Sequence, residues 1–199
     1  MYPAIFLDRD GVLIENRSDY VRDWSQVRIF SKAIEALSLV SAKRYKVVII
    51  TNQSGIGRKF ISAETAHEIN QKLVDVIEES GGQIDGVYMC PHRPEEQCSC
   101  RKPRPGLILQ AARELALDLQ RSWMIGDAWS DLLAGKDAGI HGIIMVRTGR
   151  GTEQLLQPAP ESVGDYLVSN DLSDALNNIF RIDNEQGKEF SSQSPKTSI

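Results

Sequence analysis

The segment Ala4-Ile5-Phe6-Leu7-Asp8-Arg9-Asp10-Gly11 places four apolar residues directly before two carboxylates and a glycine. A continuous apolar run of this kind is typical of a strand that is buried on both faces, as the strands of parallel sheets are. Ligands bind at the carboxyl ends of strands in open α/β sheets, and side chains two residues apart in a strand point to the same side. Asp8 and Asp10 are therefore predicted to point into one pocket, with Gly11 allowing a sharp turn behind them.

The two carboxylates carry like charges, and like charges held close together require a cation or a shared proton. Carboxylate oxygens are hard ligands that suit a hard divalent cation, so we expect Mg²⁺ at this position. The alternative is an ordinary buried strand followed by an acidic turn. The octapeptide alone leaves that alternative open.

The length and composition of the chain indicate one globular domain. With 199 residues, 41% of them hydrophobic and 25% charged, the chain is long enough to bury a sizeable core. The net charge of −4 and the lack of a basic stripe argue against nucleic acid as a partner. No apolar run is long enough to span a membrane, and no leader-like segment precedes the first strand. We therefore expect a cytoplasmic protein that contacts no membrane and acts as a monomer on a small molecule.

Apolar runs alternate with segments of helical periodicity along the chain. Strands are predicted at 4–7, 46–50, 86–89, 123–125, 142–146 and 166–168, and helices at 31–43, 62–79, 106–116, 127–138 and 172–180, with Ser31 and Ser62 as caps. This alternation predicts an α/β fold, a Rossmann-like three-layer α/β/α domain with a mostly parallel central sheet. The domain is expected to span residues 1–180 without a large cap domain. The polar segment 181–199 is expected to be a disordered tail.

Five predicted strands are followed by polar side chains. These are Asp8 with Asp10, Thr51 with Asn52, Arg101 with Lys102, Asp127 with Asp131, and Arg147 with Thr148. One polar strand end means little, but repetition along one edge of a sheet favours an active site. Carboxylates for a metal, a hydroxyl, an amide and a lysine suit phosphoryl transfer, in which cations neutralise the charge on the phosphoryl oxygens. One carboxylate can attack phosphorus, and a second can serve as acid and then as base.

Four of these elements, in this order over residues 4–149, resemble the motifs of the haloacid dehalogenase superfamily of phosphatases. They are Asp8-Arg9-Asp10-Gly11-Val12, Thr51, Lys102, and Gly126-Asp127 with Asp131. The resemblance implies that Asp8 is the nucleophile, that Asp10 is the general acid and base, and that Thr51 and Lys102 hold the phosphoryl group. It places Mg²⁺ on the Asp8 carboxylate, the Asp10 backbone carbonyl and Asp127. For Asp131 two interpretations stay open, namely support behind the metal site and an ordinary solvated helix charge.

A second signal lies in residues 90–100, which contain all three cysteines of the chain and one of its three histidines. An odd number of cysteines does not make a disulfide framework, and their clustering indicates a metal instead. Cys90, His92, Cys98 and Cys100 match a tetrahedral structural Zn²⁺ site with no open position. Such a loop insert would fix the segment that presents Arg101 and Lys102. The alternative is a reduced loop of free thiols.

The zinc loop, together with Thr51-Asn52-Gln53-Ser54-Gly55, is similar to a group that contains heptose bisphosphate phosphatases and the histidinol-phosphate phosphatase domain. Ser54 favours the heptose branch, and the short gap between His92 and Cys98 favours the other. The resemblance implies a phosphoric monoester hydrolase that removes the 7-phosphate of a heptose 1,7-bisphosphate. The expected substrate contacts are Asn16, Tyr20, Asn52, Gln53, Ser54 and Arg101. A catalytically idle zinc-stabilised binding protein remains the hypothesis from another class.

Overall fold

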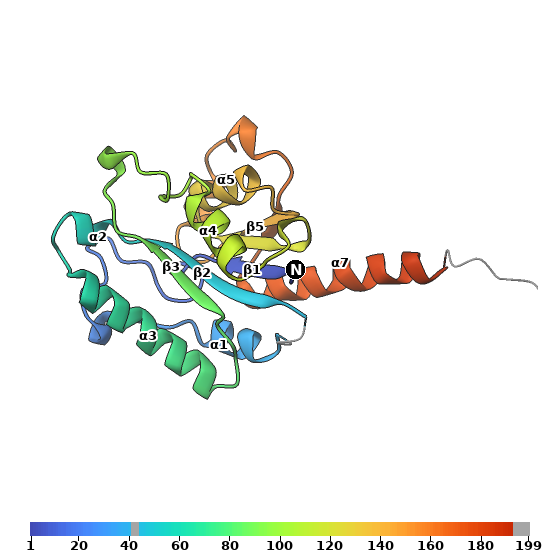
Figure 1. Cartoon of the computed structure of the whole chain (residues 1–199), viewed down its shortest axis with the longest axis horizontal. Helices are drawn as coiled ribbons and strands as arrows, with labels where there is room; N and C mark the ends of the chain where they lie inside the picture. The colour runs from blue at the N-terminus through green and yellow to red at the C-terminus, as the bar shows by residue number, and fades with distance from the viewer. Residues whose placement is uncertain (41–43, 193–199) are drawn as a thin grey trace, which may run out of the picture.

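The computed structural model describes residues 1–40 and 44–192. Six strands form one sheet in the order β3-β2-β1-β4-β5-β6, and every neighbouring pair is parallel (Figure 1). The strands are β1 (Ala4–Leu7), β2 (Lys46–Asn52), β3 (Gly86–Cys90), β4 (Trp123–Gly126), β5 (Gly142–Val146) and β6 (Leu167–Ser169). Each strand begins within one residue of its predicted position, because continuous apolar runs of this length are stable only when both faces are covered.

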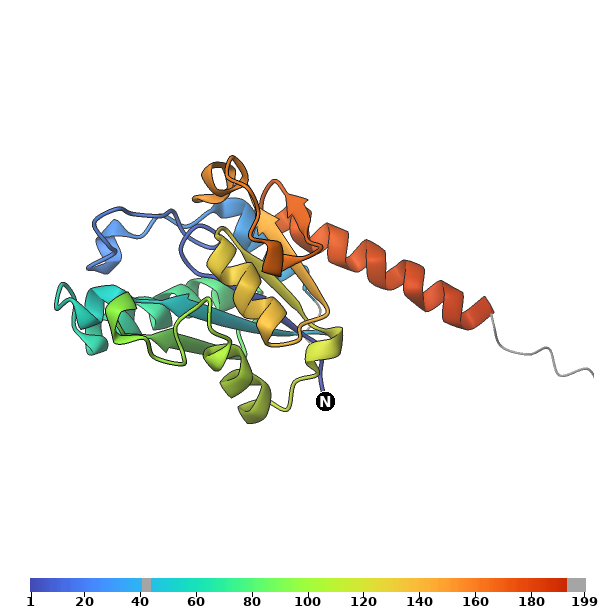
Figure 2. The ribbon, with the colours of Figure 1, turned by 90° about the horizontal axis from the view of Figure 1, so that it is seen from above.

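Helices cover both faces of the sheet. Figure 1 shows α1 and α3 below the sheet and α4 and α5 above it, and Figure 2 shows the same layers from above. The helices are α1 (Ser31–Ser38), α2 (Ser54–Gly57), α3 (Ala63–Glu79), α4 (Gly106–Glu114), α5 (Trp129–Asp137), α6 (Gly151–Leu155) and α7 (Leu172–Ser192). Short 3-10 helices lie at Trp24–Gln26, Pro94–Glu96, Leu119–Arg121 and Glu161–Val163. The predicted three-layer α/β/α fold is confirmed.

The core consists of two apolar clusters, one on each side of the sheet. Ile5 and Leu7 of β1 belong to the cluster beneath α1, α3 and α7, whereas Ala4 and Phe6 belong to the cluster beneath α4 and α5. All four side chains are fully buried. Because successive residues of a strand point to opposite faces, both faces of β1 must be apolar. This is why the run 4–7 has no polar alternation.

The position of β1 in the middle of the sheet determines where a ligand can bind. β1 pairs with β2 on one side, with Ile5 beside Val47, and with β4 on the other, with Leu7 beside Ile125. Chain connections run outward to β3 on one side and to β6 on the other, so the strand order reverses between β1 and β4. The loops at the carboxyl ends separate at such a point and leave a crevice. The described part of the connection from β1 to β2 holds one 3-10 turn and α1.

The two predicted serine caps differ in outcome. The Ser62 hydroxyl accepts a hydrogen bond from the backbone N–H of Thr65, so Ser62 caps α3 as predicted. Ser31 is instead the first residue of α1, and Phe30 precedes it without a side-chain capping bond. The regular part of α1 ends at Ser38, and the last predicted helical residues, 41–43, lie outside the described residues.

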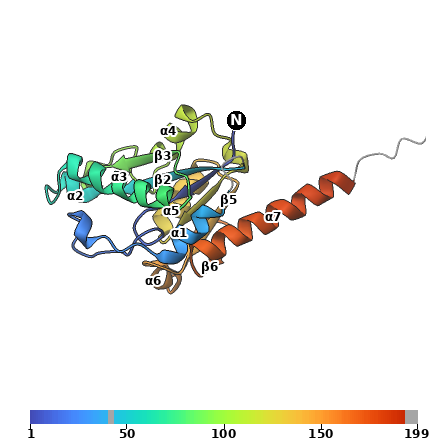
Figure 3. The same ribbon diagram turned by 90° about the horizontal axis from the view of Figure 1, so that it is seen from below.

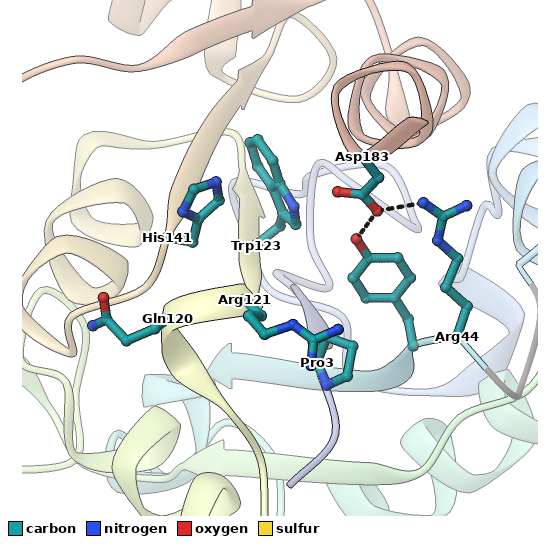
Figure 4. A pocket seen from close by; sticks show the side chains of 8 residues that line it. Pro3, Arg44, Gln120, Arg121, Trp123, His141 and Asp183 are labelled. Atoms are coloured by element: carbon teal, nitrogen blue, oxygen red, sulfur yellow. Dashed lines mark hydrogen bonds and ion pairs between the residues drawn. The ribbon is translucent and has the colours of Figure 1, made fainter. Parts of the chain in front are cut away.

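Residues 181–192, which the sequence analysis assigns to a tail, continue α7 in the structure. Phe180 and Ile182 pack against the core, and the Asp183 carboxylate accepts hydrogen bonds from Arg44, at 2.9 Å, and from the Tyr45 hydroxyl (Figure 4). These contacts hold the first half of α7, so the helix continues although the sequence becomes polar. Figure 3 shows α7 extending away from the sheet. Residues 193–199 lie outside the described residues.

Among the helices of the described ranges, none combines the length and the apolar character that crossing a membrane requires.

Candidate active site

The side chain of Lys102 lies in a buried charged cluster at the carboxyl edge of the sheet. Its ammonium nitrogen is 2.7 Å from Oδ1 of Asp8, which follows β1, and 2.7 Å from Oδ1 of Asp131 on α5. The same nitrogen donates to the carbonyl oxygen of Ile50 at 2.7 Å. The exposed fraction of each of the three charged side chains is 7% or less, so water screens the charges little. Three segments distant in the sequence thus meet at one buried point.

The polar end of β2 holds this cluster in place. Asn52 donates from its side-chain amide to the carbonyl oxygen of Lys102 and accepts from the Lys102 backbone N–H, both at 3.1 Å. Gln53 donates from Nε2 to the hydroxyl of Thr51 and to Oδ2 of Asp10, each at 2.8 Å. The predicted substrate contacts Asn52 and Gln53 therefore already bind groups of the site itself. The Thr51 hydroxyl accepts from Gln53, which leaves its own proton free to donate.

Asp127 closes the cluster on the side of β4. Its Oδ2 accepts hydrogen bonds from the Asn16 side-chain amide at 2.5 Å and from the backbone N–H of Arg150 at 2.8 Å. Its Oδ1 is buried and has no hydrogen-bond partner among the described residues, although the Arg150 guanidinium lies 3.6 Å away. Gly11 and Gly149 both have positive φ, and a Cβ on either would collide with the Asp127 carboxylate. Two glycines are therefore required for the backbone to approach this side chain.

Burial governs the protonation of these groups. It raises the pKa of Asp8 to about 6, although the charge of Lys102 opposes the shift. Burial also disfavours the charged form of Lys102, but the carboxylates of Asp131 and Asp8 outweigh it and raise the Lys102 pKa to about 12. The pKa of Asp127 is raised by burial first and by the charge of Asp8 second. Lys102 pairs with two of the three buried carboxylates and the Arg150 guanidinium lies 3.6 Å from Asp127, so two cations face three carboxylates and a further cation would favour their ionised forms.

The donor set fits a magnesium ion. Asp8, Asp127 and Asp131 each offer an oxygen within 4.8 Å of the others. Asp131 is engaged by Lys102 and by the backbone N–H of Ala128, at 3.0 Å. Asp8 and Asp127 remain as the candidate ligands. The strongest support comes from Oδ1 of Asp127, which is buried without a hydrogen bond and has only the Arg150 guanidinium, at 3.6 Å, as a charged neighbour among the described residues. A buried carboxylate oxygen without a donor is costly unless a cation binds it.

Asp10, the predicted acid and base, is held by Arg9. The Arg9 guanidinium contacts both oxygens of the Asp10 carboxylate, with Nη2 at 3.0 and 2.9 Å. Sequence reasoning gave no role to Arg9 or to Arg150. Arg9 lies within the strand-end motif, and Arg150 directly follows Arg147-Thr148-Gly149, so position at a strand end was the signal that could have indicated both.

The four residues of the predicted zinc site come together in the structure. The sulfur atoms of Cys90, Cys98 and Cys100 lie 3.3–3.6 Å from one another. Nδ1 of His92 lies 3.6 Å from Cys90 Sγ and 3.3 Å from Cys100 Sγ. Zinc–sulfur bonds of ~2.3 Å in a tetrahedral site would give sulfur–sulfur distances of about 3.8 Å, only slightly longer than those observed. Burial opposes ionisation of Cys98, but hydrogen bonds from Cys100 and Cys90 outweigh it and lower the Cys98 pKa to about 7. The set therefore fits Zn²⁺.

The remaining predicted substrate contacts surround the cluster at different depths. Arg101 is half-buried and donates to the carbonyl oxygen of His92 at 3.3 Å. Ser54 is buried at the start of α2. Tyr20 lies farther out, where its ring packs against Phe60 with a centroid separation of 5.5 Å. Asn16 donates a hydrogen bond to the carboxylate of Asp127, a candidate metal ligand, so the structure joins Asn16 to the centre of the cluster.

A cavity at the amino edge of the sheet is separate from this cluster. It has a volume of about 230 Å³ and is lined by residues that include Arg44, Arg121, Trp123 and His141 (Figure 4). None of the predicted site residues lines it. The chemistry-bearing groups therefore gather at the opposite, carboxyl edge, as open α/β sheets require.

Comparisons with known proteins agree with this geometry. A family model described as HAD-hydrolase-like matches residues 99–175. The D-glycero-beta-D-manno-heptose-1,7-bisphosphate 7-phosphatase of Pasteurella multocida is 40% identical over 156 residues, which are 75% of this chain and 84% of the relative. The protein of the same name from Helicobacter pylori strain J99 is 41% identical over 144 residues, 72% of this chain and 82% of the relative.

Solved structures give the same result. The crystal structure of D,D-heptose 1,7-bisphosphate phosphatase from B. bronchiseptica, complexed with magnesium and phosphate, superposes with a TM-score of 0.83 at 31% identity. The match covers 90% of this chain and 99% of that one. The predicted resemblance is thereby confirmed. A chain that shares this identity and coverage with these relatives belongs to the HAD-like hydrolases and, within them, to the family of the D-glycero-beta-D-manno-heptose-1,7-bisphosphate 7-phosphatases.

Proposed function

We propose that this chain hydrolyses the 7-phosphate of D-glycero-beta-D-manno-heptose 1,7-bisphosphate through a phosphorylated Asp8. The observation that carries the proposal is the buried Asp8 carboxylate, which contacts the Lys102 ammonium at 2.7 Å and offers an oxygen within 4.8 Å of the Asp127 carboxylate. A nucleophilic carboxylate must be neutralised before it approaches a phosphate dianion; Lys102 supplies one positive charge, and a cation held by Asp8 and Asp127 would supply the other. The substrate itself comes from the family to which the chain belongs.

The first half-reaction transfers the phosphoryl group to the protein. An Asp8 oxygen bonds to phosphorus while the bond from phosphorus to the C7 oxygen breaks, and Asp10 protonates the departing alkoxide. Lys102 and the free hydroxyl proton of Thr51 contact the phosphoryl oxygens as their charge redistributes. In the second half-reaction Asp10 takes a proton from water, the water oxygen bonds to phosphorus, and the bond to Asp8 breaks.

Asp8, Asp127 and the backbone carbonyl of Asp10 would hold the magnesium ion. When bound, Mg²⁺ supplies positive charge that brings the substrate phosphate next to the carboxylates. Asn16 and the backbone N–H of Arg150 fix the Asp127 carboxylate through Oδ2. Oδ1, which accepts no hydrogen bond from the described residues and lies 3.6 Å from the Arg150 guanidinium, is the oxygen that would bind the cation.

Cys90, His92, Cys98 and Cys100 would hold a zinc ion with a structural role. Four protein ligands leave no position for substrate, so the ion would act by closing the loop. Lys102 follows the last ligand by two residues. A closed loop therefore fixes the backbone from which the catalytic ammonium projects.

Arg101 is our candidate for binding the second phosphate of the substrate. A cavity of about 230 Å³ beside Lys102 is lined by residues that include Arg101, Arg104, Pro94 and Gln97. Guanidinium groups bind phosphates through paired hydrogen bonds. The phosphate that reacts and the phosphate that stays would then occupy neighbouring positions. Asn16, Tyr20, Asn52, Gln53 and Ser54 are proposed to line the sugar side.

We infer a monomer in the cytoplasm. Every residue of the proposed reaction comes from one chain, so a second copy is not required. The three thiols of the zinc loop would stay reduced in that compartment. Gel filtration coupled to light scattering tests the monomer.

A phosphate-release assay over heptose 1,7-bisphosphates, histidinol phosphate and other sugar phosphates tests the proposed function. We expect the largest kcat/KM for the heptose bisphosphate, with Mg²⁺ required. An equal or larger kcat/KM for histidinol phosphate would move the assignment to that substrate. No release from any phosphate ester, with Mg²⁺ present and the chain folded, would favour a binding protein without catalysis.

A further inference from the structure

The Arg9 side chain is the largest fully buried side chain of the described residues, and it lies next to the proposed acid and base. Its Nε and Nη2 donate to the Asp10 carboxylate at 2.9–3.2 Å, and its Nη1 donates to Oδ1 of Asn70 at 2.7 Å. We propose that Arg9 and Asn70 are positioning residues that fix the orientation of the Asp10 carboxylate. This inference rests on the proposed phosphatase reaction, in which Asp10 transfers the proton.

Asn70 is an unusual residue for its place in the fold. It belongs to the buried face of α3, where its neighbours on that face are Ala66, Ile69, Leu73 and Ile77. Asn70 itself is 4% exposed. A primary amide on an apolar helix face loses its hydrogen bonds to water, so it is favourable only where a partner replaces them. The Arg9 guanidinium is that partner, and no catalytic motif includes this helix.

The guanidinium of Arg9 is expensive to bury unless its charge is paired and its donors are satisfied. Asp10 is its only ion-pair partner within the described ranges. Asn70 binds the remaining edge of the planar group, so the guanidinium cannot rotate away from Asp10 without breaking a hydrogen bond. The planar guanidinium contacts both oxygens of the Asp10 carboxylate and so fixes its position and its plane. By holding the guanidinium in one orientation, Asn70 indirectly fixes the orientation of the Asp10 carboxylate.

Gln53 completes the support from the opposite element. Its Nε2 donates to Oδ2 of Asp10 at 2.8 Å. Helix α3 and the end of β2 therefore converge on one carboxylate whose side chain is 22% exposed. A residue that protonates a leaving oxygen must lie within hydrogen-bond reach of it, and a small misplacement is costly. The support from Arg9 and Asn70 is thus expected to matter only for proton transfer.

If Arg9 and Asn70 matter only for proton transfer, their effect must depend on how strongly the leaving group needs a proton. An alkyl phosphate needs a proton donor for its strongly basic alkoxide, whereas 4-nitrophenyl phosphate leaves as a stable anion and needs little help. The parameter kcat/KM reports only the steps up to formation of the phosphorylated Asp8. It therefore isolates proton donation to the leaving group from the later attack of water.

The experiment compares Asn70→Leu with wild type, Mg²⁺ present, on 4-nitrophenyl phosphate and on a sugar phosphate that the wild type hydrolyses. Leucine preserves the volume of the side chain and removes the acceptor for Arg9. We expect kcat/KM for the sugar phosphate to fall ~10-fold or more, part of the ~10²–10⁴-fold that a positioned acid supplies. The value for 4-nitrophenyl phosphate should change less than about threefold on the same grounds. Asn70→Asp keeps an acceptor oxygen for Arg9, so its ratio of kcat/KM for the sugar phosphate to kcat/KM for 4-nitrophenyl phosphate should equal that of the wild type.

Ile69→Val is the matched control, because it alters the same buried face of α3 without a polar contact. It should lower thermal stability without changing the ratio of the two substrates. Equal losses on both substrates in Asn70→Leu would overturn the inference, since a purely structural defect acts on both. If Asn70→Leu does not fold, Asn70→Ser makes the same comparison. A wild type inactive on both esters would instead overturn the proposed function.

Discussion

The ammonium nitrogen of Lys102 lies 2.7 Å from Oδ1 of Asp131, and both side chains are 2% exposed. The same nitrogen is 2.7 Å from Oδ1 of Asp8. Lys102 is thus shared between the proposed nucleophile and a carboxylate that takes no part in the chemistry. The burial of Asp131 excludes the interpretation of this residue as a solvated helix charge. Its position indicates that Asp131 anchors the Lys102 ammonium beside Asp8.

Replacement of Asp131 by asparagine should therefore impair catalysis without touching the substrate. Lys102 would lose one of two anchors, and a displacement of about 1 Å can cost ~100-fold in rate. We expect kcat to fall by that order, KM to change little, and the melting temperature to drop. Asp137→Asn, on the exposed side of the same helix, is the control and should behave as wild type. Unchanged kcat in Asp131→Asn would contradict the anchoring role.

Asp8→Asn should abolish turnover and leave the fold intact. An amide does not attack phosphorus, and the change also weakens one candidate metal ligand. Activity should fall at least ~1,000-fold, as for other enzymes that lose a nucleophile. Mass spectrometry of the acid-quenched wild type should show a phosphoryl group on the Asp8 peptide. Purified Asp8→Asn that retained about a tenth of the wild-type rate would rule out the nucleophile assignment.

Gly11→Ala should weaken magnesium binding. Its Cβ would collide with the Asp127 carboxylate, whose free oxygen is the proposed ligand. We expect the Mg²⁺ concentration for half-maximal activity to rise, on the order of 10-fold, as for other changes beside metal ligands. Gly81→Ala is a matched control, because Gly81 also has a positive φ but nothing lies within 4 Å of its added Cβ. Gly81→Ala should lower stability but leave the dependence on Mg²⁺ unchanged. Calorimetric titration with Mg²⁺ gives a readout independent of turnover.

The zinc loop should carry one zinc per chain after purification without added metal. Cys98→Ser should lose the ion and destabilise the segment that leads to Lys102, because metal binding in such loops is coupled to folding. Elemental analysis and protection of the loop amides from hydrogen exchange measure both effects. His141→Gln, a histidine outside the loop, should leave the zinc content unchanged. Full activity in a zinc-free wild-type chain would contradict the structural role.

Arg101→Ala should narrow the preference for a bisphosphate over the corresponding monophosphate. The guanidinium is proposed to bind the phosphate that stays, so its loss should raise KM for the bisphosphate alone. We expect KM for the bisphosphate to rise ~10-fold or more, which corresponds to the loss of charge-assisted hydrogen bonds. Arg104→Ala is the comparison, since Arg104 lines the same cavity but is bound to the carbonyl oxygens of Gln97 and Cys98. If the ratio of kcat/KM for the bisphosphate to kcat/KM for the monophosphate is unchanged in Arg101→Ala, Arg101 does not bind the second phosphate.

Local sequence determined the strands, the layers and the chemical inventory of this protein. Residues 4–7 are apolar at every position, which predicts a strand buried on both faces, and Asp8 and Asp10 follow at its carboxyl end, where ligands bind in parallel sheets. Both inferences need only a few consecutive residues, so the sequence was sufficient for them. The clustering of Cys90, His92, Cys98 and Cys100 in eleven positions was likewise sufficient to predict that their side chains meet.

Only the tertiary structure decided which partner each polar group takes. The pairs Lys102–Asp131, Arg9–Asn70 and Arg150–Asp127 join residues 23–61 positions apart, and no local pattern encodes such contacts. The tertiary structure also determined the length of α7, because Asp183 contacts Arg44 and Tyr45 only once the sheet has formed. Burial is the physical reason for both: once water is excluded, each charge and amide must find a partner in the fold, and that choice is made by packing.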